Sequence, residues 1–384
     1  MEHNRKEAAV IVSPDYPPHS GGVERYSWHL AGELRKRGMN VFVVSSSMKG
    51  EPKRQEDERG VFVLRFPSLW PIPDRMPVPL PSGSWKQLEN RLKDYSSVKV
   101  IVQTNLYPLS LEGVRFANQL GYSCLTIVHG SNFACLGSGL VDRLENRYEA
   151  WLVQAQKKNG TRFAAVSQAG ASFLEKHGCQ VNTVAYNAID YEEIDAISVN
   201  SPSLKERFGL SPETVIFTYV GRLIREKGVL QLAKAFVQLQ KEAEQPVALF
   251  VVGDGPLRQE METKKGRNLF PIGQKEHRDA ISILKQSDCF LLPSDSEGFP
   301  TTVLEAAACG AYVITSPFGG CREAAELVNG AVMPGNSAED IIAACKEYLD
   351  GREAAAERAR EGDRNLRNTI SWSNTAEYIL QALE

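Results

Sequence analysis

The sequence has no hydrophobic run long enough to cross a membrane. No window approaches the roughly 18 apolar residues that a spanning helix needs. The first apolar run, AAVIV at residues 8–12, is also too short for a secretory signal and leads straight into SPDYPP. These absences predict a cytoplasmic protein, with any membrane contact peripheral and at the inner face.

Cysteine pairs and a strong net charge are also missing. The seven cysteines form no CxxC pair and no metal-ligand spacing, which indicates reduced, buried thiols. A net charge of −3 over 384 residues argues against bulk nucleic-acid binding. The charge is uneven, with +5 in residues 1–190 and −8 in the remainder. The basic half suits an anionic acceptor or a membrane surface, and it equally fits a chance asymmetry of solvated faces.

What the sequence contains is a regular alternation of short apolar strands and amphipathic helices. Runs such as TVIFTYVGR and CFLLPS predict buried strands, and GVLQLAKAFVQL repeats apolar residues at helical spacing. Such strands alternating with helices form parallel sheets covered on both faces. We therefore expect an α/β protein of two Rossmann-like domains, residues 1–195 and 196–370. Their parallel sheets are expected to face an inter-domain cleft, with ligands at the carboxyl ends of the strands.

Two glycine motifs follow predicted strands. The pair at 21–22 stands before an amphipathic helix, where Gly22 lets the backbone approach an anionic ligand or simply forms a flexible turn. VVGDGPL at 251–257 has Arg258 where a dinucleotide fingerprint requires its third glycine. We interpret this second motif as a strand-end turn that lines the cleft.

Three charged or titratable residues lie at the ends of predicted strands or in the turns that follow them. In VGRLIREKG, Arg222 leaves a strand and Lys227 lies five residues later, at the start of the next helix. Two cations converging there suit a diphosphate, although surface ion pairing would also explain them. His129 ends the strand TIVHG, where it serves as a functional base or donor or as a hydrogen-bonded core histidine.

The stretch SDSEGFPTTVLEAAACG places two carboxylates eight residues apart. Glu297 lies in a turn, Glu305 lies one turn into the following helix, and the backbone N–H groups of 298–302 form an anion site between them. The oxygens of Glu305 suit a vicinal diol such as a ribose, and Glu297 lies closer to a sugar hydroxyl or reacting carbon. Compensation of the helix dipole would explain Glu305 alone, but not the combination of Glu305 with Glu297 and the amides between them.

Taken together, these motifs resemble the retaining glycosyltransferases of the GT-B fold, family 4, typified by bacterial cell-surface and phosphatidylinositol mannosyltransferases. The resemblance covers nearly the whole chain and rests on GGVE (21–24), HG (129–130), VSQAG (166–170), YNAID (186–190), VGRLIREKG (220–228), VGDGPL (252–257), FPIGQ (270–274), EGFPTTVLEAAACG (297–310), FGG…E (318–323) and SW (371–372). The chain departs from the family where NAID replaces NGVD and GGCRE replaces GG-x-Pro-Glu.

The resemblance implies a role for each motif residue. Gly22 would lie against the donor phosphate or the acceptor, Arg222 and Lys227 would clamp the nucleotide diphosphate, and His129 would lie by the reacting sugar. The donor sugar and β-phosphate would be held by the amides of Gly298, Phe299, Pro300, Thr301 and Thr302, the sugar also by Glu297, the ribose by Glu305 and the base by the backbone near Lys275. Residues 371–384 would form a helix that packs back on the first domain.

The resemblance also implies the reaction and its partners. It predicts transfer from a nucleotide-diphosphate sugar, with retention by front-face attack and no cofactor; because no DxD motif is present, no essential metal is expected. The acceptor is a glycan or a lipid-linked molecule, and Arg35, Lys36 and Arg37 suggest a membrane-proximal one. A glycosidase would also use paired carboxylates but has no need of diphosphate-binding cations. A non-catalytic nucleotide-sugar-binding subunit is the remaining alternative.

Overall fold

The computed structural model describes residues 6–18, 21–47, 52–70, 77–104, 106–132, 139–199, 201–264 and 268–384. The chain forms two compact units, one made of residues 1–187 and 372–384 and the other of residues 188–371. Residues 188–195, expected in the first domain, belong to the second, because the short helix at 191–196 packs against a helix of that unit.

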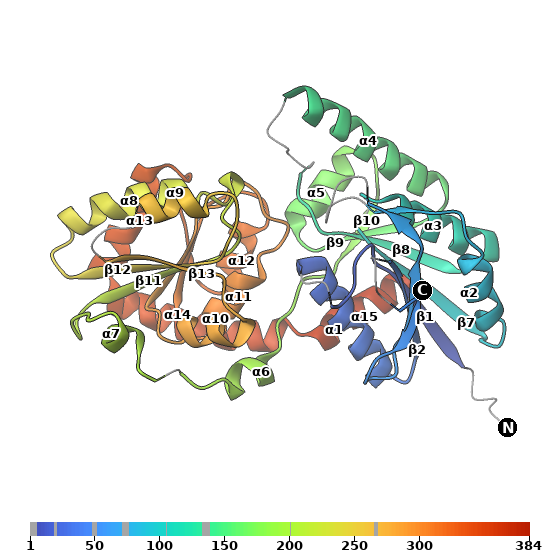
Figure 1. Cartoon of the computed structure of the whole chain (residues 1–384), viewed down its shortest axis with the longest axis horizontal. Coiled ribbons are helices and arrows are strands. Elements are labelled where there is room, and N and C mark those ends of the chain that lie inside the picture. The colour runs from blue at the N-terminus through green and yellow to red at the C-terminus, as the bar shows by residue number, and fades with distance from the viewer. Residues whose placement is uncertain are drawn as a thin grey trace. The chain divides into compact units, whose positions relative to one another are not determined.

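The first unit is built on an eight-stranded sheet in the order β10-β9-β8-β7-β1-β2-β4-β3 (Figure 1). All its strand pairs are parallel except β3 with β4. Its elements are β1 (Glu7–Val12), α1 (Gly22–Lys36), β2 (Asn40–Ser46), β3 (Arg54–Glu56), β4 (Phe62–Phe66), β5 (Ser68–Leu69), β6 (Val78–Pro79), α2 (Ser84–Leu92), β7 (Ser97–Gln103), α3 (Pro108–Leu120), β8 (Ser123–Val128), α4 (Gly139–Lys158), β9 (Arg162–Ala165), α5 (Gln168–Lys176), β10 (Val181–Val184) and α15 (Trp372–Leu383).

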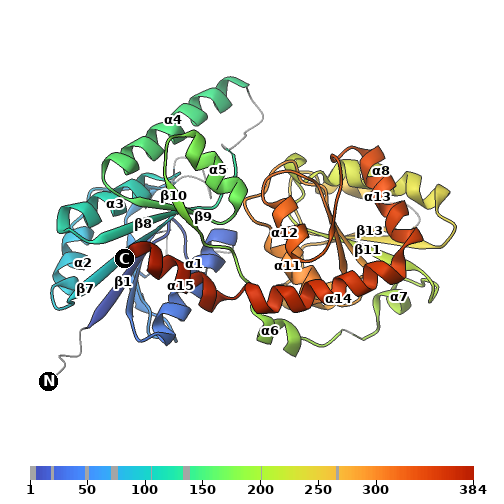
Figure 2. The same cartoon turned by 180° about the vertical axis from the view of Figure 1, so that it is seen from behind.

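Helices cover both faces of this sheet, which explains why its parallel strands are largely apolar. Helices α2 and α3 pack on the face formed by alternate β1 residues such as Val10 and Val12. Helices α1 and α15 pack against each other, and α15 also contacts β8, β9 and β10 (Figure 2). The order of the strands reverses between β1 and β7, so the two following loops diverge there and leave room for a ligand.

The second unit is built on a six-stranded, wholly parallel sheet in the order β13-β12-β11-β14-β15-β16. Its elements are α6 (Tyr191–Ala196), α7 (Leu204–Arg207), β11 (Val215–Val220), a 3₁₀ turn (Arg225–Lys227), α8 (Val229–Glu242), β12 (Val247–Val252), α9 (Arg258–Thr263), β13 (Leu269–Gly273), α10 (His277–Leu284), β14 (Cys289–Leu292), α11 (Thr301–Ala308), β15 (Tyr312–Thr315), α12 (Cys321–Leu327), β16 (Ala331–Val332), α13 (Ala338–Asp350) and α14 (Arg352–Thr369). The strand order reverses between β11 and β14.

Both faces of the second sheet are also covered. Helices α8, α9 and α13 lie on one side and α10, α11 and α14 on the other (Figure 1). The prediction of two α/β units with parallel sheets is therefore confirmed, and in each unit the reversal of strand order marks the edge where a ligand site is expected.

Glycines in the loop after β12 allow it to approach the loop after β11. Gly253 has φ +145°, and a Cβ atom there would lie 1.9 Å from the carbonyl oxygen of Gly221. The N–H of Leu223 donates to the carbonyl of Asp254 at 2.8 Å across the same contact. The VGDG motif is therefore a strand-end turn that packs two loops together at the carboxyl edge of the sheet.

Gly253→Ala is expected to lower the free energy of unfolding by about 3 kcal/mol or more, because the backbone conformation and the close carbonyl both exclude a side chain. Gly310→Ala is the matched control: Gly310 also has a positive φ, +87°, but nothing lies within 4 Å of its would-be Cβ. That control should cost about 1–2 kcal/mol. Urea titrations followed by circular dichroism would compare the two, and equal losses would refute the close-approach argument.

The chain passes between the units twice. In each unit, a hydrogen bond joins a residue near the first crossing to a residue near the second. In the second unit, the Tyr191 hydroxyl donates to the carbonyl of Ile370 at 3.0 Å. In the first, the Thr375 hydroxyl donates to the carbonyl of Tyr186 at 2.8 Å. Helix α15, which follows the second crossing, belongs to the first unit.

The Pro-rich segment 67–81 contains a short antiparallel pair, β5 with β6, while residues 71–76 lie outside the described residues. The six cysteines in the described part of the chain are free, and five of them are buried. None of the described helices combines the length and hydropathy required to span a bilayer.

Candidate active site

Two loops meet at the carboxyl edge of the second sheet, where the strand order reverses. One follows β11 and carries Lys227, and the other follows β14 and carries Glu297. The N–H of Asp295 donates to the carbonyl of Glu226 at 2.8 Å and joins the loops directly. Gly228, with φ +66°, permits this approach because a Cβ there would lie 2.0 Å from the carbonyl oxygen of Pro293.

The predicted cation and carboxylate on these loops form an ion pair with each other. Lys227 Nζ donates to Glu297 Oε1, which also accepts a hydrogen bond from the Ser294 hydroxyl at 2.9 Å. The side chains of Lys227 and Glu297 are 16% and 14% exposed, so both charges are largely shielded from water. Removing either one would leave the other charge buried without a partner, which destabilises the fold.

Arg222 stands at the same edge and is exposed, directly after β11. Its carbonyl accepts a hydrogen bond from the Tyr219 hydroxyl at 2.9 Å, which fixes the backbone from which the side chain leaves. Within the described part of the chain its guanidinium makes no ion pair. Of the two cations predicted to bind a diphosphate, Lys227 is therefore already paired, whereas Arg222 has no partner among the described side chains.

Helix α11 begins beside this pair, with Pro300 as its N-cap residue. Because proline has no N–H group, the predicted row of amides across 298–302 is interrupted, and the donors at the helix start are those of Thr301 and Thr302. The loop before the helix is held from the other side: the N–H of Gly320 donates to the carbonyl of Glu297 at 3.0 Å. A Cβ at Gly320 would lie 2.0 Å from the carbonyl oxygen of Gly298.

Glu305 is buried at 6% exposure inside α11, and its carboxylate is supported by a histidine. His277 Nε2 lies 3.2 Å from Glu305 Oε1, and its Nδ1 lies 3.0 Å from Glu193 Oε1. The imidazole thus bridges two carboxylates from α6 and α11. The sequence analysis did not identify His277 or Glu193 as partners of Glu305. The one signal for His277 was its place at the start of α10, two residues after Lys275.

Lys275 follows β13, immediately before α10, and lines a small pocket with Arg207 and Phe208. It stands at the same carboxyl edge of the sheet as Arg222, on its outermost parallel strand. The second unit therefore contains every predicted donor-site residue except Gly22. Gly22 and His129 belong to the first unit.

Of the two roles left open by the sequence, the structure shows the hydrogen-bonded one for His129, which follows β8. Its Nε2 lies 2.7 Å from Oε1 of the buried Gln103, and its ring packs edge-on against Tyr26 at 4.8 Å. Desolvation lowers the pKa of His129 to about 3. The imidazole is therefore neutral across the physiological range and acts there as a hydrogen-bonding group, not as a cation.

A pH dependence of stability follows from the lowered pKa of His129. Below about pH 6.5 the unfolded chain takes up a proton that the folded chain binds only near pH 3, so the free energy of unfolding falls as pH drops through that window. The expected loss is about 1 kcal/mol per pH unit. Urea titrations at several pH values should show this slope in the wild type and a shallower one in His129→Gln. Parallel slopes would contradict the assignment.

Gly22 and Thr104 lie at the reversal of strand order in the first sheet. Gly22 opens α1, and a Cβ there would meet nothing within 4 Å, so local packing does not demand the glycine. Thr104, buried directly after β7, has φ +66°, which is rare for a β-branched residue. Sequence reasoning missed Thr104 because nothing in QTN signals a left-handed conformation.

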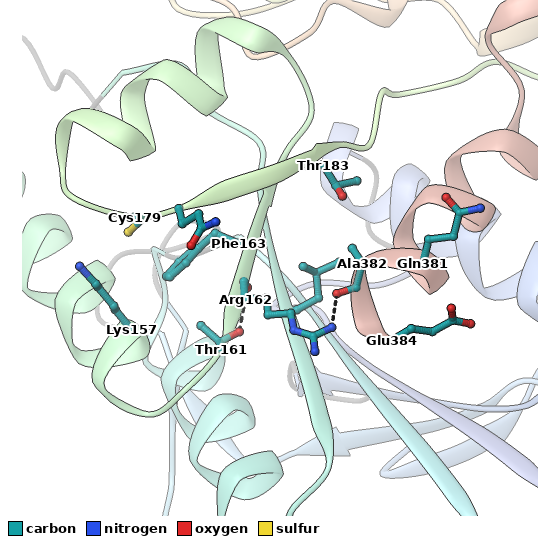
Figure 3. Close-up of a pocket in the computed structure, with 11 residues that line it drawn as sticks. Lys157, Thr161, Arg162, Phe163, Cys179, Thr183, Gln381, Ala382 and Glu384 are labelled. Atoms are coloured by element: carbon teal, nitrogen blue, oxygen red, sulfur yellow. Dashed lines mark hydrogen bonds between the residues drawn. The ribbon is translucent and has the colours of Figure 1, made fainter.

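The pocket in Figure 3, about 670 Å³, lies elsewhere in the first unit, among β8, β9, β10 and α15. Its cations are already engaged: Arg162 Nη1 donates to the carbonyl of Ala382 at 2.6 Å, and Lys157 Nζ donates to the carbonyl of Gly178. It contains none of the predicted site residues. No group of three His, Cys, Asp or Glu side chains suited to a metal occurs among the described residues.

The basic triplet at 35–37, which suggested a membrane-proximal acceptor, is largely bound within the first unit. Arg37 pairs with Glu377 at 2.6 Å and donates to the carbonyl of Ser373. Arg35 donates to the carbonyls of Met39 and Arg59. Lys36 is 78% exposed and pairs with Glu33 at 3.4 Å, so each cation of the triplet has a partner within the first unit.

Two family descriptions match adjacent parts of the chain. Residues 20–193 match "Glycosyltransferase Family 4", and residues 200–365 match "Glycosyl transferases group 1". The two matched segments correspond to the two compact units and leave little of the chain uncovered.

Named relatives align over nearly the full length. The chain is 25% identical to an uncharacterised glycosyltransferase of Methanocaldococcus jannaschii, over 99% of both chains. It is 26% identical to glycogen synthase of Mycobacterium tuberculosis, over 97% of this chain and 93% of that protein. It is 24% identical to a GDP-mannose-dependent phosphatidylinositol monomannoside mannosyltransferase of Mycolicibacterium smegmatis, over 90% and 91%.

Solved structures share the fold at lower sequence identity. Sucrose-phosphate synthase from Thermosynechococcus elongatus superposes with a TM-score of 0.76 at 17% identity, over 98% of both chains. HepE from Anabaena, solved with UDP-glucose, superposes with a TM-score of 0.73 at 17% identity, over 98% of this chain and 99% of that one. These proteins place the two-unit architecture described above among the GT-B structures.

Proposed function

Because the chain belongs to the family 4 glycosyltransferases of the GT-B fold, we propose that it is a retaining enzyme that uses a UDP- or GDP-sugar. The acceptor is a glycan or a lipid-linked molecule of cell-surface polysaccharide or glycolipid synthesis. In this proposal the second unit binds the nucleotide sugar and the first unit binds the acceptor.

One observation carries the proposal: the cations and carboxylates predicted for a nucleotide sugar gather at a single sheet edge. Arg222, Lys227 and Glu297 lie on the loops after β11 and β14, and α11 follows the second of these loops and carries Glu305. The carboxyl edge at a reversal of strand order is where α/β sheets bind nucleotides. A glycosidase would need the carboxylates, but Arg222, which has no ion-pair partner among the described side chains, would have no role in it.

The proposed reaction breaks the bond between the anomeric carbon and the diphosphate oxygen, and forms a bond from that carbon to the acceptor oxygen on the same face. The acceptor's proton moves to the leaving phosphate. Negative charge therefore grows on the diphosphate, where Arg222, Lys227 and the first amides of α11 stabilise it. Glu297, held beside Lys227 by Ser294, contacts hydroxyl groups of the donor sugar.

Glu305 binds the ribose hydroxyls in this proposal, and His277 is a positioning residue for it. With Oε1 fixed by the imidazole, the carboxylate is held in one rotamer before the donor arrives. Glu193, on α6, contacts the other ring nitrogen, Nδ1, and so fixes the orientation of the imidazole. The backbone near Lys275, on the adjoining strand end, lines the base.

In the first unit, His129 and Gly22 serve the reacting end of the substrates. A neutral His129 accepts or donates a hydrogen bond to a sugar hydroxyl, consistent with its desolvated setting, and does not act as a titrating base near pH 7. The open space beside Gly22 admits a phosphate or acceptor group close to the start of α1.

A thermal-shift screen against UDP- and GDP-sugars tests the donor, and the same hit is then incubated with glycan and lipid-linked acceptors. A stabilising donor whose transfer product keeps the anomeric configuration by NMR supports the proposal. Inversion of the configuration would refute retention. Donor binding with no turnover of any acceptor, and no slow hydrolysis of the donor, would favour the non-catalytic binding subunit instead.

A further inference from the structure

Helix α4 exposes an apolar stripe on its outward face. Leu144 is 63% exposed and Trp151 is 54% exposed, among the most exposed large apolar side chains of the described chain. Tyr148 lies between them in sequence, and its ring stacks on that of Trp151 at 6.1 Å with 23° between the planes. The spacing of three and four residues places the three side chains in a single row along the helix.

Cations border this stripe. At about 100° per residue, Arg143, Arg147 and Lys158 fall with the stripe inside one arc of about 140°. All three are exposed. Between residues 143 and 158, where the side chains of α4 are described, this arc contains no acidic side chain.

The acidic residues of the same segment point the other way. Glu149 is buried at 3% exposure, and the charges of Glu145 and Glu149 both act on Tyr107, whose pKa is raised to about 12 chiefly by desolvation. Helix α4 packs on α3 through this inner side. Charge is therefore sorted across the helix, with carboxylates inward and cations outward beside the apolar row.

This combination fits a lipid surface better than a second copy of the chain. A two-fold contact between α4 helices would bring Arg143 and Arg147 of one copy toward the same cations of the other. An anionic bilayer pairs with these cations and receives the apolar row, as interfacial helices do with Trp and Leu on one side and Lys or Arg beside them. Amphipathic aromatic rings such as Trp and Tyr are favoured at the level of the headgroups.

We propose that this α4 face, formed by Arg143, Leu144, Arg147, Tyr148 and Trp151, docks the protein on an anionic lipid surface. The contact is peripheral, with Leu144 and Trp151 inserted at the boundary of headgroup and acyl chain and the arginines on phosphates. Its link to catalysis rests on the proposed function, because a membrane-docked enzyme would meet a lipid-linked acceptor at that surface.

Vesicle flotation of the full chain tests the proposal. The protein is expected to float with vesicles of phosphatidylcholine and phosphatidylglycerol at low salt, and to float weakly with phosphatidylcholine alone. Arg143→Glu/Arg147→Glu and Leu144→Ser/Trp151→Ser should each lower partitioning at least tenfold. The matched control, Lys234→Glu/Lys241→Glu, reverses two exposed charges on α8 and should float like the wild type.

Three outcomes would overturn the proposal: a wild type that stays unbound to anionic vesicles, α4 variants that float as well as the wild type, or a control that loses binding as they do. Light scattering adds a fourth, since a dimer that Leu144→Ser/Trp151→Ser converts to monomer would assign the face to a second copy. Thermal shifts with UDP- and GDP-sugars, measured on the same variants, report the donor site separately. Failure of lipid binding is thereby distinguished from failure of the proposed enzymatic function.

Discussion

Lys227→Ala is expected to lower kcat/KM for sugar transfer about a thousandfold, the loss typical of removing one preorganised group that stabilises charge in the transition state. The amine has two tasks in the proposed mechanism, since it neutralises the leaving diphosphate and holds Glu297 in place. Transfer from the best donor of the screen, measured at subsaturating donor, provides the number. Lys234→Ala removes an exposed lysine from α8 and should leave the rate unchanged.

Binding of a nucleoside diphosphate without a sugar separates the two tasks of Lys227, because Glu297 is assigned to the donor sugar. If the amine acts on the diphosphate, Lys227→Ala should weaken that binding about tenfold or more. If the amine serves only to hold Glu297, the variant should bind the nucleoside diphosphate as the wild type does. Activity of Lys227→Ala within threefold of the wild type would disprove the diphosphate role outright.

Glu305→Gln is expected to raise the KM for the donor about 10- to 100-fold, because hydrogen bonds to a carboxylate contribute about 1.5–3 kcal/mol. The decisive measurement compares a nucleoside diphosphate with its 2′,3′-dideoxy analogue. The wild type should bind the analogue more weakly by a similar factor, whereas the variant should bind both alike. Glu339→Gln, in the first turn of α13, controls for compensation of the helix dipole and should change neither value.

His277→Gln distinguishes ribose binding from a merely structural role of Glu305. Loss of the support at Oε1 should weaken donor binding several-fold while discrimination against the dideoxy analogue persists, because the carboxylate is still present. If Glu305→Gln itself retained that discrimination, the assignment of Glu305 to the ribose would be wrong.

The strands were predictable where their residues are buried on both faces. In β11 and β14, unbroken apolar runs end at polar turns, so their position and their parallel pairing follow from composition and alternation with helices. The two-residue strands β5, β6 and β16 have no such pattern, since their pairing depends on neighbours already in place. The antiparallel β3, RQE, reads as a polar loop for the same reason.

The positions of the candidate site residues at the sheet edge were also predictable, but their partners were not. Strand ends at a reversal of order identify Arg222, Lys227 and Glu297 as candidates. The ion pair between Lys227 and Glu297 joins positions 70 residues apart, and it depends on β11 lying next to β14. His277 was missed because its two carboxylate partners come from α6 and α11, which no local pattern brings together.

The two crossings give the chain the topology of a domain insertion. Tyr191 and Ile370, at the two ends of the second unit, are hydrogen bonded, and so are Tyr186 and Thr375, at the break in the first. Residues 188–371 could therefore be excised, and the gap they leave closed by a short linker, without stretching either sheet. The excised piece carries all four of the charged side chains assigned to the donor, so it should bind nucleotide on its own. A circular permutant opened between residues 187 and 188 should also still bind nucleotide.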